Sequence, residues 1–292
     1  MKQLQTLQLL TGDVAHRTLN DYVQHFKSGK SVLEESVMVA DALRSFDARF
    51  QFSEQRRYAT TSKSQAGDVF CALVDHEYGV PVSAEDIQSW RDTIQKAITN
   101  FFTVVVDTRN GPRNVGDLLR SASFVESEYD GFNFHLEGVL VRLKIDLALL
   151  FCSGNQKQAV LIDWKLEKNE HANNETQLLI YGYGCLKHWG LAGALKPEDI
   201  VLLEVNLLNR STKRYQFTEK HVAVIDDLMF ESIRELKHVM NGRPYEDFRL
   251  TEFPLTQNGN SCRICNLKEV CLQHLQSEEE EHGKLVLELF SN

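Results

Sequence analysis

The stretch AVLIDWKLEKN, residues 159–169, decides how this chain is interpreted. Four apolar residues predict a buried strand, and they run directly into Asp163, Trp164 and Lys165. Because the side chains of a strand alternate between its faces, Asp163 and Lys165 share one face. Ionised groups at the edge of a hydrophobic core need a partner or a function. The stretch therefore predicts either an ion pair at a strand end or a polar site at that place.

A second acid supports the site. Asp146 lies in LKIDLAL, on the strand before the SGNQ turn, and Asp163 lies on the strand after it. Two strands joined by a short turn bring both carboxylates to one edge of a sheet. Hard cations such as Mg²⁺ prefer oxygen ligands, and a bound cation can hold a phosphate and activate water. With Lys165 to orient the water or stabilise developing charge, the three residues are candidates for phosphodiester hydrolysis, although D-x-K alone is a weak signal.

Composition describes an ordinary globular protein. The chain has 292 residues, of which 42% are hydrophobic and 25% charged. We expect a cytoplasmic protein (nuclear or organellar in a eukaryote) with no membrane partner, because no apolar run is long enough to span a bilayer and no signal peptide is apparent. The net charge of −9 disfavours a DNA binder that relies on Lys and Arg alone. Metal ions in an acidic site can supply part of that charge.

Hydrophobic periodicity predicts a mixed α/β fold of strands flanked by helices. Residues 1–60 are predicted to be helical, and turns are expected at Asp130-Gly131 and Gly154-Asn155. Further helices are expected over 62–79, 84–105, 173–190 and 221–240, and strands within 124–164, 198–209 and 213–218. The helix over 62–79 would begin at Ser62 or Ser64 and end at Gly79.

Three sequence blocks follow one another along the chain: LKID at 143–146, LIDWK at 161–165 and QLLIY at 177–181. Together they resemble the RecB-like branch of the PD-(D/E)XK nucleases. The resemblance implies a restriction-endonuclease-like mixed central sheet and a Mg²⁺- or Mn²⁺-dependent deoxyribonuclease. It also implies that Asp146 and Asp163 bind the metal with help from the Trp164 carbonyl.

The third block places Gln177 and Tyr181 four residues apart, on one face of a helix. Taken alone, the two residues would be half-buried helix contacts. In the family this face looks onto the active site, and the resemblance implies the same here.

Three cysteines, Cys262, Cys265 and Cys271, are close enough in sequence to share one metal or cluster. A fourth ligand would come from Cys71, Cys152 or Cys185. The segment SKSQAGDVFC, with Ser62, Ser64 and Cys71, resembles the iron–sulfur subset of these nucleases, which includes CRISPR-adaptation accessory nucleases, exonuclease V and the AddB nuclease domain. The resemblance implies a structural [4Fe–4S] cluster on Cys71 and the three C-terminal cysteines, with Zn²⁺ as the alternative. Cys152 and Cys185 are then expected to be core thiols.

The chain departs from the family pattern at two places. Leu143 stands where the family often has glycine, which puts a bulky side chain where the backbone usually approaches closely. A metal-binding histidine in a G-x-x-x-H pattern is expected between the first cysteine and the first aspartate, and neither His76 nor His135 fits it. We therefore expect a metal site with fewer ligands, or one completed by Glu126 from FVESE.

The domain organisation expected from these motifs is a helical extension at 1–60, a nuclease domain at 61–275 and an acidic tail at 276–292. The resemblance implies action on single-stranded DNA or DNA ends, as an exonuclease in DNA repair or in defence against phages and mobile elements. The alternative is a catalytically weak DNA-binding or docking subunit of a helicase- or integrase-type complex. A third reading is a metal-stabilised scaffold with no role on nucleic acid.

Overall fold

The computed structural model describes residues 4–31, 33–108, 111–154, 156–167, 174–189 and 195–248, together with residues 252, 265 and 271. The chain divides into two compact units. One comprises residues 1–11, 44–90 and 242–292, and the other comprises residues 12–43 and 91–241. In the described part of the chain, no helix combines the length and apolar content needed to cross a membrane.

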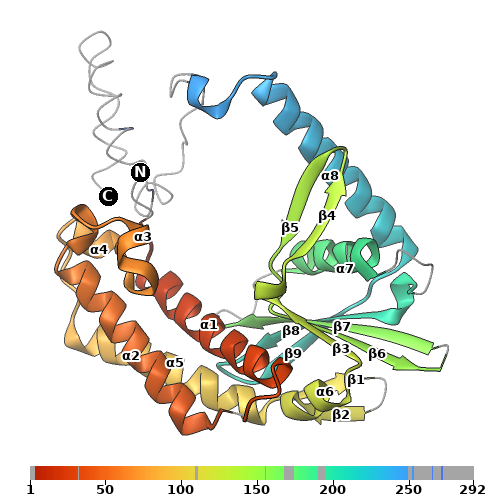
Figure 1. Cartoon of the computed structure of the whole chain (residues 1–292), viewed down its shortest axis with the longest axis horizontal. Coiled ribbons are helices and arrows are strands. Elements are labelled where there is room, and N and C mark those ends of the chain that lie inside the picture. The colour runs from red at the N-terminus through yellow and green to blue at the C-terminus, as the bar shows by residue number, and fades with distance from the viewer. Residues whose placement is uncertain are drawn as a thin grey trace. The chain divides into compact units, whose positions relative to one another are not determined.

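The order of helices and strands confirms the mixed α/β class (Figure 1). The α-helices are α1 (Leu7–Lys27), α2 (Glu35–Glu54), α3 (Lys63–Ala66), α4 (Val74–Glu77), α5 (Ala84–Thr103), α6 (Val115–Ser121), α7 (Glu175–Trp189) and α8 (Glu219–Met240). The strands are β1 (Val105–Thr108), β2 (Gly111–Asn114), β3 (Phe124–Ser127), β4 (Phe132–Leu136), β5 (Val139–Leu143), β6 (Leu147–Ser153), β7 (Gln156–Lys165), β8 (Ile200–Asn206) and β9 (Ser211–Tyr215). Short 3₁₀ turns cover Arg57–Ala59, Gly67–Val69, Glu128–Asp130, Pro197–Asp199 and Tyr245–Asp247.

The larger sheet has the strand order β3-β6-β7-β8-β9. Strands β6 and β7 are antiparallel, with Leu147 opposite Ile162, and Gly154 at their turn has the left-handed φ of 58°. Strands β7 and β8 are parallel, so the chain must cross back between them, and α7 lies in this crossover. The mixed central sheet with flanking helices that the sequence predicted is therefore present.

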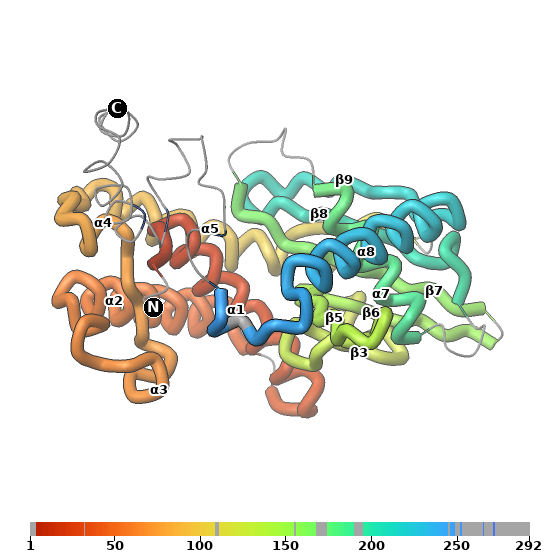
Figure 2. Tube along the Cα trace, turned by 90° about the horizontal axis from the view of Figure 1, so that it is seen from above, coloured from red at the N-terminus to blue at the C-terminus, as the bar shows by residue number. Residues whose placement is uncertain are grey.

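Alternation along the strands separates the two faces of this sheet. On one face, apolar side chains of β6, β7 and β8 pack with α7 and α8 in a single core that includes Ala148, Leu161, Leu178, Leu202 and Ile225. Figures 1 and 2 show α7 between the sheet and α8. On the other face, the indole of Trp164 meets the ring of Phe101 from α5 edge to face, with centroids 5.4 Å apart.

Two features of this unit were not expected. Strands β4 and β5 leave the sheet and form their own hairpin, which packs on α7 through contacts such as that between Phe134 and Tyr183. Between α5 and β3 the chain also forms the β1–β2 hairpin and α6. Both short strands of that hairpin are mostly polar or half-exposed, so they lack a strong apolar alternation.

The single helix predicted over 62–79 is wrong. Ser62 does begin a helix, since its hydroxyl accepts from the Gln65 amide, but α3 ends at Ala66 and the chain is extended around Cys71 before α4. The break has a long-range cause: Gln5 accepts from the amide of Val74 and donates to the carbonyl of Ala72. These bonds take backbone groups that a continuous helix would need.

Candidate functional site

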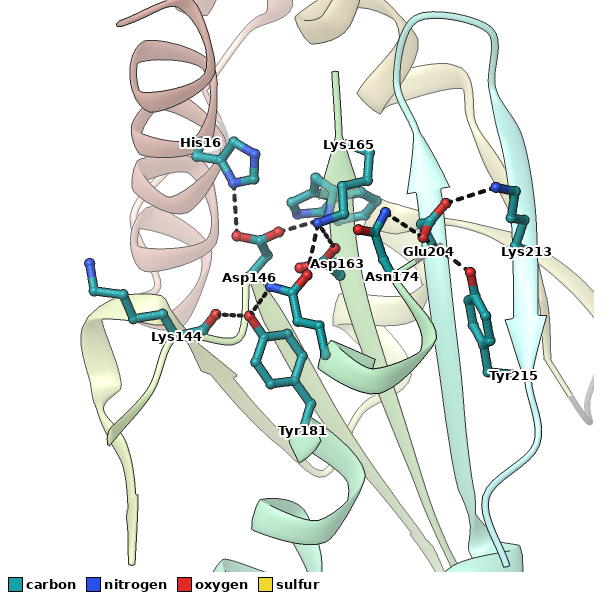
Figure 3. A network of polar contacts seen from close by, with 12 residues as sticks. His16, Lys144, Asp146, Asp163, Lys165, Asn174, Tyr181, Glu204, Lys213 and Tyr215 are labelled. Atoms are coloured by element: carbon teal, nitrogen blue, oxygen red, sulfur yellow. Dashed lines mark hydrogen bonds and ion pairs between the residues drawn. The ribbon is translucent and has the colours of Figure 1, made fainter. Parts of the chain in front are cut away.

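The polar site lies on the core-facing side of the sheet, at the strand ends where the apolar residues stop. Asp146 immediately precedes β6, and Asp163 and Lys165 close β7. By alternation they continue the same face as Ala148 and Leu161, toward α7. Leu147 of β6 is paired with Ile162 of β7, and Asp146 and Asp163 lie one position beyond this pair. Their carboxylates are therefore neighbours (Figure 3).

Lys165 joins this sheet edge to α7. Its ammonium nitrogen lies 2.7 Å from Oδ2 of Asp163 and donates to Oε1 of Gln177 at 3.0 Å. Gln177 in turn donates to the hydroxyl of Tyr181 at 2.8 Å, and that hydroxyl donates to the carbonyl of Lys144 at 2.8 Å. The helical face with Gln177 and Tyr181 thus meets the strand ends and fixes the position of Lys165.

The sequence analysis missed His16 of α1. Its Nδ1 lies 2.8 Å from Oδ1 of Asp146, and the other oxygen of Asp146 accepts from the amide of Trp164 at 2.7 Å. The signal was present: Gly12 and His16 form a G-x-x-x-H pattern, but it lies before Cys71 rather than after it.

Burial and neighbouring charge shift the acid–base behaviour of the site. Burial, followed by the charge of Asp146, raises the pKa of Asp163 to about 6, although Lys165 and His16 pull it down. Burial opposes the charged form of His16, but the charge and hydrogen bond of Asp146 outweigh it and raise the pKa of His16. Burial and the two aspartates also raise the pKa of Tyr181, so its hydroxyl stays a donor.

Glu126, the candidate additional ligand, has a described partner of its own. It stands on β3 opposite Ala148, and its Oε2 lies 3.3 Å from Nε2 of His188 at the end of α7. The ring of His188 also contacts Phe132. Glu126 is thus paired with a histidine that the sequence did not single out, and no described contact joins it to Asp146 or Asp163.

Leu143, the residue in place of the family glycine, is accommodated by a glycine elsewhere. A Cβ added to Gly184 of α7 would come within 2.1 Å of Cδ1 of Leu143 and 3.3 Å of Cε1 of Phe134. The absence of a side chain at Gly184 therefore lets α7 pack closely against β5. This packing carries the α7 face with Gln177 and Tyr181 against Lys144.

The donors at this site fit a hard divalent cation. Oδ2 of Asp163 is buried and lies 2.7 Å from the Lys165 ammonium, and beside the Asp163 carboxylate lie the carboxylate of Asp146 and the imidazole of His16. Carboxylate oxygens suit such cations, whereas the imidazole is a softer donor that is better matched to transition metals. No group of three or more His, Cys, Asp or Glu side chains in the described part of the chain is already arranged around a metal position. Cation binding would therefore compete with the contacts that Asp146 and Asp163 now make.

The cysteines are only partly described. Cys71 is buried and its sulfur accepts a hydrogen bond from Nε2 of Gln5 at 2.9 Å. Cys265 and Cys271 fall in the same compact unit as Cys71, whereas Cys262 lies outside the described residues.

The two remaining cysteines behave differently from each other. Cys185 is a buried thiol, as expected, and burial raises its pKa. The prediction that Cys152 is a core thiol is wrong, because the residue is exposed where β6 runs beyond the core.

Comparison with known proteins gives one match. The family model described as the PD-(D/E)XK nuclease superfamily matches residues 2–272, a range that contains His16, both aspartates and Lys165. No curated protein matches the chain, and no solved structure does.

Proposed function

Because this chain belongs to the PD-(D/E)XK nuclease superfamily, we propose that it hydrolyses phosphodiester bonds of DNA at the site formed by Asp146, Asp163 and Lys165. The observation that carries the proposal is the convergence of these side chains. The lysine ammonium lies 2.7 Å from one buried carboxylate, and the second carboxylate belongs to Asp146, just before the neighbouring strand β6. An ion pair without a function would not need a second acid beside it.

Asp146, Asp163 and His16 are proposed to hold Mg²⁺ or Mn²⁺, together with the Trp164 carbonyl. When bound, such a cation lowers the pKa of a water and neutralises developing phosphate charge. Lys165 orients the attacking water and stabilises the charge that develops on the phosphate. Gln177 accepts from Lys165 and so restricts its ammonium to the site.

Tyr181 completes this arrangement without touching the reacting atoms. Its hydroxyl receives a hydrogen bond from Gln177 and donates to Lys144 O, so the amide of Gln177 cannot turn its oxygen away from Lys165 without losing a bond. A positioned donor is worth more in a water-poor site than in bulk water.

The substrate class is proposed from the RecB-like motifs. On this basis the chain acts on single-stranded DNA or duplex ends, as an exonuclease in repair or in defence against mobile elements, with a helicase or integrase as protein partner. Duplexes with blunt ends, single strands and closed circles, offered in parallel, separate these substrates.

A [4Fe–4S] cluster on Cys71, Cys262, Cys265 and Cys271 is proposed as a structural element, with Zn²⁺ as the alternative. In support, the sulfur of Cys71 is buried and accepts an amide hydrogen bond from Gln5. Amide donors of this kind stabilise the charge on cluster sulfurs.

The test is cleavage of labelled single-stranded DNA by the purified full chain with Mn²⁺. We expect cleavage by the wild type, and loss of cleavage in Asp163→Ala and Lys165→Met with the fold retained. Asp226→Asn, which removes the charge of a carboxylate outside the site, serves as the matched control and should cleave normally. Tight DNA binding by the wild type without any cleavage would instead support the binding or docking subunit.

A further inference from the structure

A third carboxylate stands beside the site and has no assigned role. Glu204 of β8 is paired in register with Asp163 of β7, and its side chain therefore projects from the same face of the sheet. It is only 5% exposed. Burying a carboxylate without partners costs free energy, so the contacts of Glu204 indicate its role.

Glu204 binds three donors from two directions. Its Oε2 accepts from Nδ2 of Asn174 at 3.0 Å and from the hydroxyl of Tyr215 at 3.2 Å, and its Oε1 lies 3.4 Å from the ammonium of Lys213 (Figure 3). Tyr215 and Lys213 belong to β9, which is paired with β8. They hold the carboxylate in place, which leaves Asn174 as its contact toward α7.

Asn174 immediately precedes α7. Its carbonyl accepts the amide of Leu178, the first helical bond, while its side chain donates to Glu204. Gln177 lies in this first turn and contacts Lys165. A displacement of the first turn would therefore move the Gln177 oxygen away from the Lys165 ammonium.

Strand β8 also holds the other side of the connection between β7 and α7. Nδ2 of Asn206 donates to the carbonyl of Glu167, just beyond β7, at 2.7 Å. Asn206 is paired with Lys165 in the sheet and is itself buried. Two buried polar side chains of β8, two positions apart, thus anchor the chain on both sides of the connection between β7 and α7.

We propose that Glu204 is a positioning residue of the active site: through Asn174 it fixes the first turn of α7 and thereby sets Gln177 against Lys165. The proposal rests on the proposed nuclease function, because the group being positioned is the lysine of that site. Glu204 touches neither metal nor substrate, and it acts only through the hydrogen bond to Asn174.

The experiment compares kcat for Mn²⁺-dependent cleavage among single and double variants of the full chain. We expect Glu204→Ala and Asn174→Ala each to lower kcat by about 10–100-fold, the usual cost of losing a supporting partner. Glu204→Gln keeps an oxygen that accepts from Asn174, so it should recover most of the loss.

A double-mutant cycle separates positioning from general damage. If Glu204 acts through Gln177, then Glu204→Ala in a Gln177→Ala background should add little further loss of kcat, although its effect on melting temperature remains. Fully additive losses of kcat would overturn the proposal. The Asn174→Ala variant, which leaves the Glu204–Lys213 pair intact, repeats the test in case Glu204→Ala fails to fold.

The matched control is Asp226→Ala. The Asp226 carboxylate accepts a hydrogen bond from Tyr183 and thus also anchors α7, but about two turns beyond the start of the helix. If Asp226→Ala lowers kcat as much as Glu204→Ala does, then the loss of any contact that holds α7 is enough to lower kcat. That result would exclude a specific role for Glu204.

A readout independent of activity separates this proposal from the proposed function. Glu204→Ala should speed hydrogen exchange of the Leu178 amide and shift the side-chain amide resonances of Gln177, whereas Asp226→Ala should leave both unchanged. If the wild type cleaves no DNA but these shifts occur, the nuclease proposal fails and the positioning stands. If the wild type cleaves and neither kcat nor these signals change in Glu204→Ala, the positioning is wrong.

Discussion

Nδ1 of His16 lies 2.8 Å from Oδ1 of Asp146, although the two residues are 130 positions apart in the sequence. The contact brings the first helix of the chain to the acidic strand ends. His16 is 27% exposed at its side chain and Asp146 only 9%, so the imidazole stands between the buried acid and solvent. A residue in this position can reach whatever binds to the carboxylate.

His16→Ala is expected to lower the rate of Mn²⁺-dependent DNA cleavage by roughly tenfold or more, as for lost ligands or their partners in metal sites. The loss should be reduced at high Mn²⁺ concentration, since the variant binds the cation less tightly. Titration of cleavage rate with Mn²⁺ measures this. His25→Ala, on the same helix, provides the control. An unchanged Mn²⁺ requirement in His16→Ala would exclude His16 as a ligand.

The stability of the metal-free protein should depend on pH through Asp163. Its folded pKa of about 6 lies above the ordinary value of 3.8, so protonation stabilises the folded state. That contribution is complete below about pH 4 and is lost as the pH rises through about 6. The raised pKa of His16 acts in the same direction, with its loss at higher pH.

Thermal melting in a chelator from pH 5 to pH 8 tests this linkage. Asp163→Asn cannot ionise, so its melting temperature relative to the wild type should rise with pH. A constant difference between the two proteins across this range would show that Asp163 titrates at an ordinary pKa.

Gly184→Ala should destabilise the fold by about 1–3 kcal/mol, the usual range for overpacking, because the new methyl group meets Leu143. Adding Leu143→Ala should remove that clash, so the two substitutions together cost less than the sum of their separate effects. Chemical denaturation of the four proteins gives the coupling. Gly12→Ala, where the added methyl group meets open space, should not destabilise. Additive costs would show that Leu143 and Gly184 are not in contact.

Cys71→Ser should lose the metal that we propose at the cysteine site. We expect the wild type to contain iron with broad visible absorbance, or one zinc ion, and the variant to contain neither and to melt at a lower temperature, because metal binding is coupled to folding. Elemental analysis and visible spectra provide the measurement. Cys152→Ser, at an exposed site, should retain the metal. Equal metal content in wild type and Cys71→Ser would remove Cys71 from the ligand set.

Much of the sheet followed from local sequence. Alternation placed Asp163 and Lys165 on one face of a strand, and the spacing of Gln177 and Tyr181 placed both on one face of a helix. These features depend on residues within one or two turns of each other, so the backbone periods are sufficient to predict them.

Prediction from local sequence failed where a distant segment hydrogen-bonds to the same backbone groups that a local helix would use. The helix expected through Cys71 is broken because backbone bonds to Gln5 take its amides and carbonyls. The departure at Leu143 looked unfavourable until Gly184, on another element, was seen to leave room for it.

The sequence by itself determined that Asp163 and Lys165 share one face of a strand and that Gln177 and Tyr181 share one face of a helix, because each pair is set by the short-range period of its own strand or helix. Only the tertiary structure decided that His16 approaches Asp146, and that Glu204 holds the start of α7 through Asn174. These contacts join residues far apart in the chain, and they exist because packing of the core brings their elements together, which no local pattern encodes.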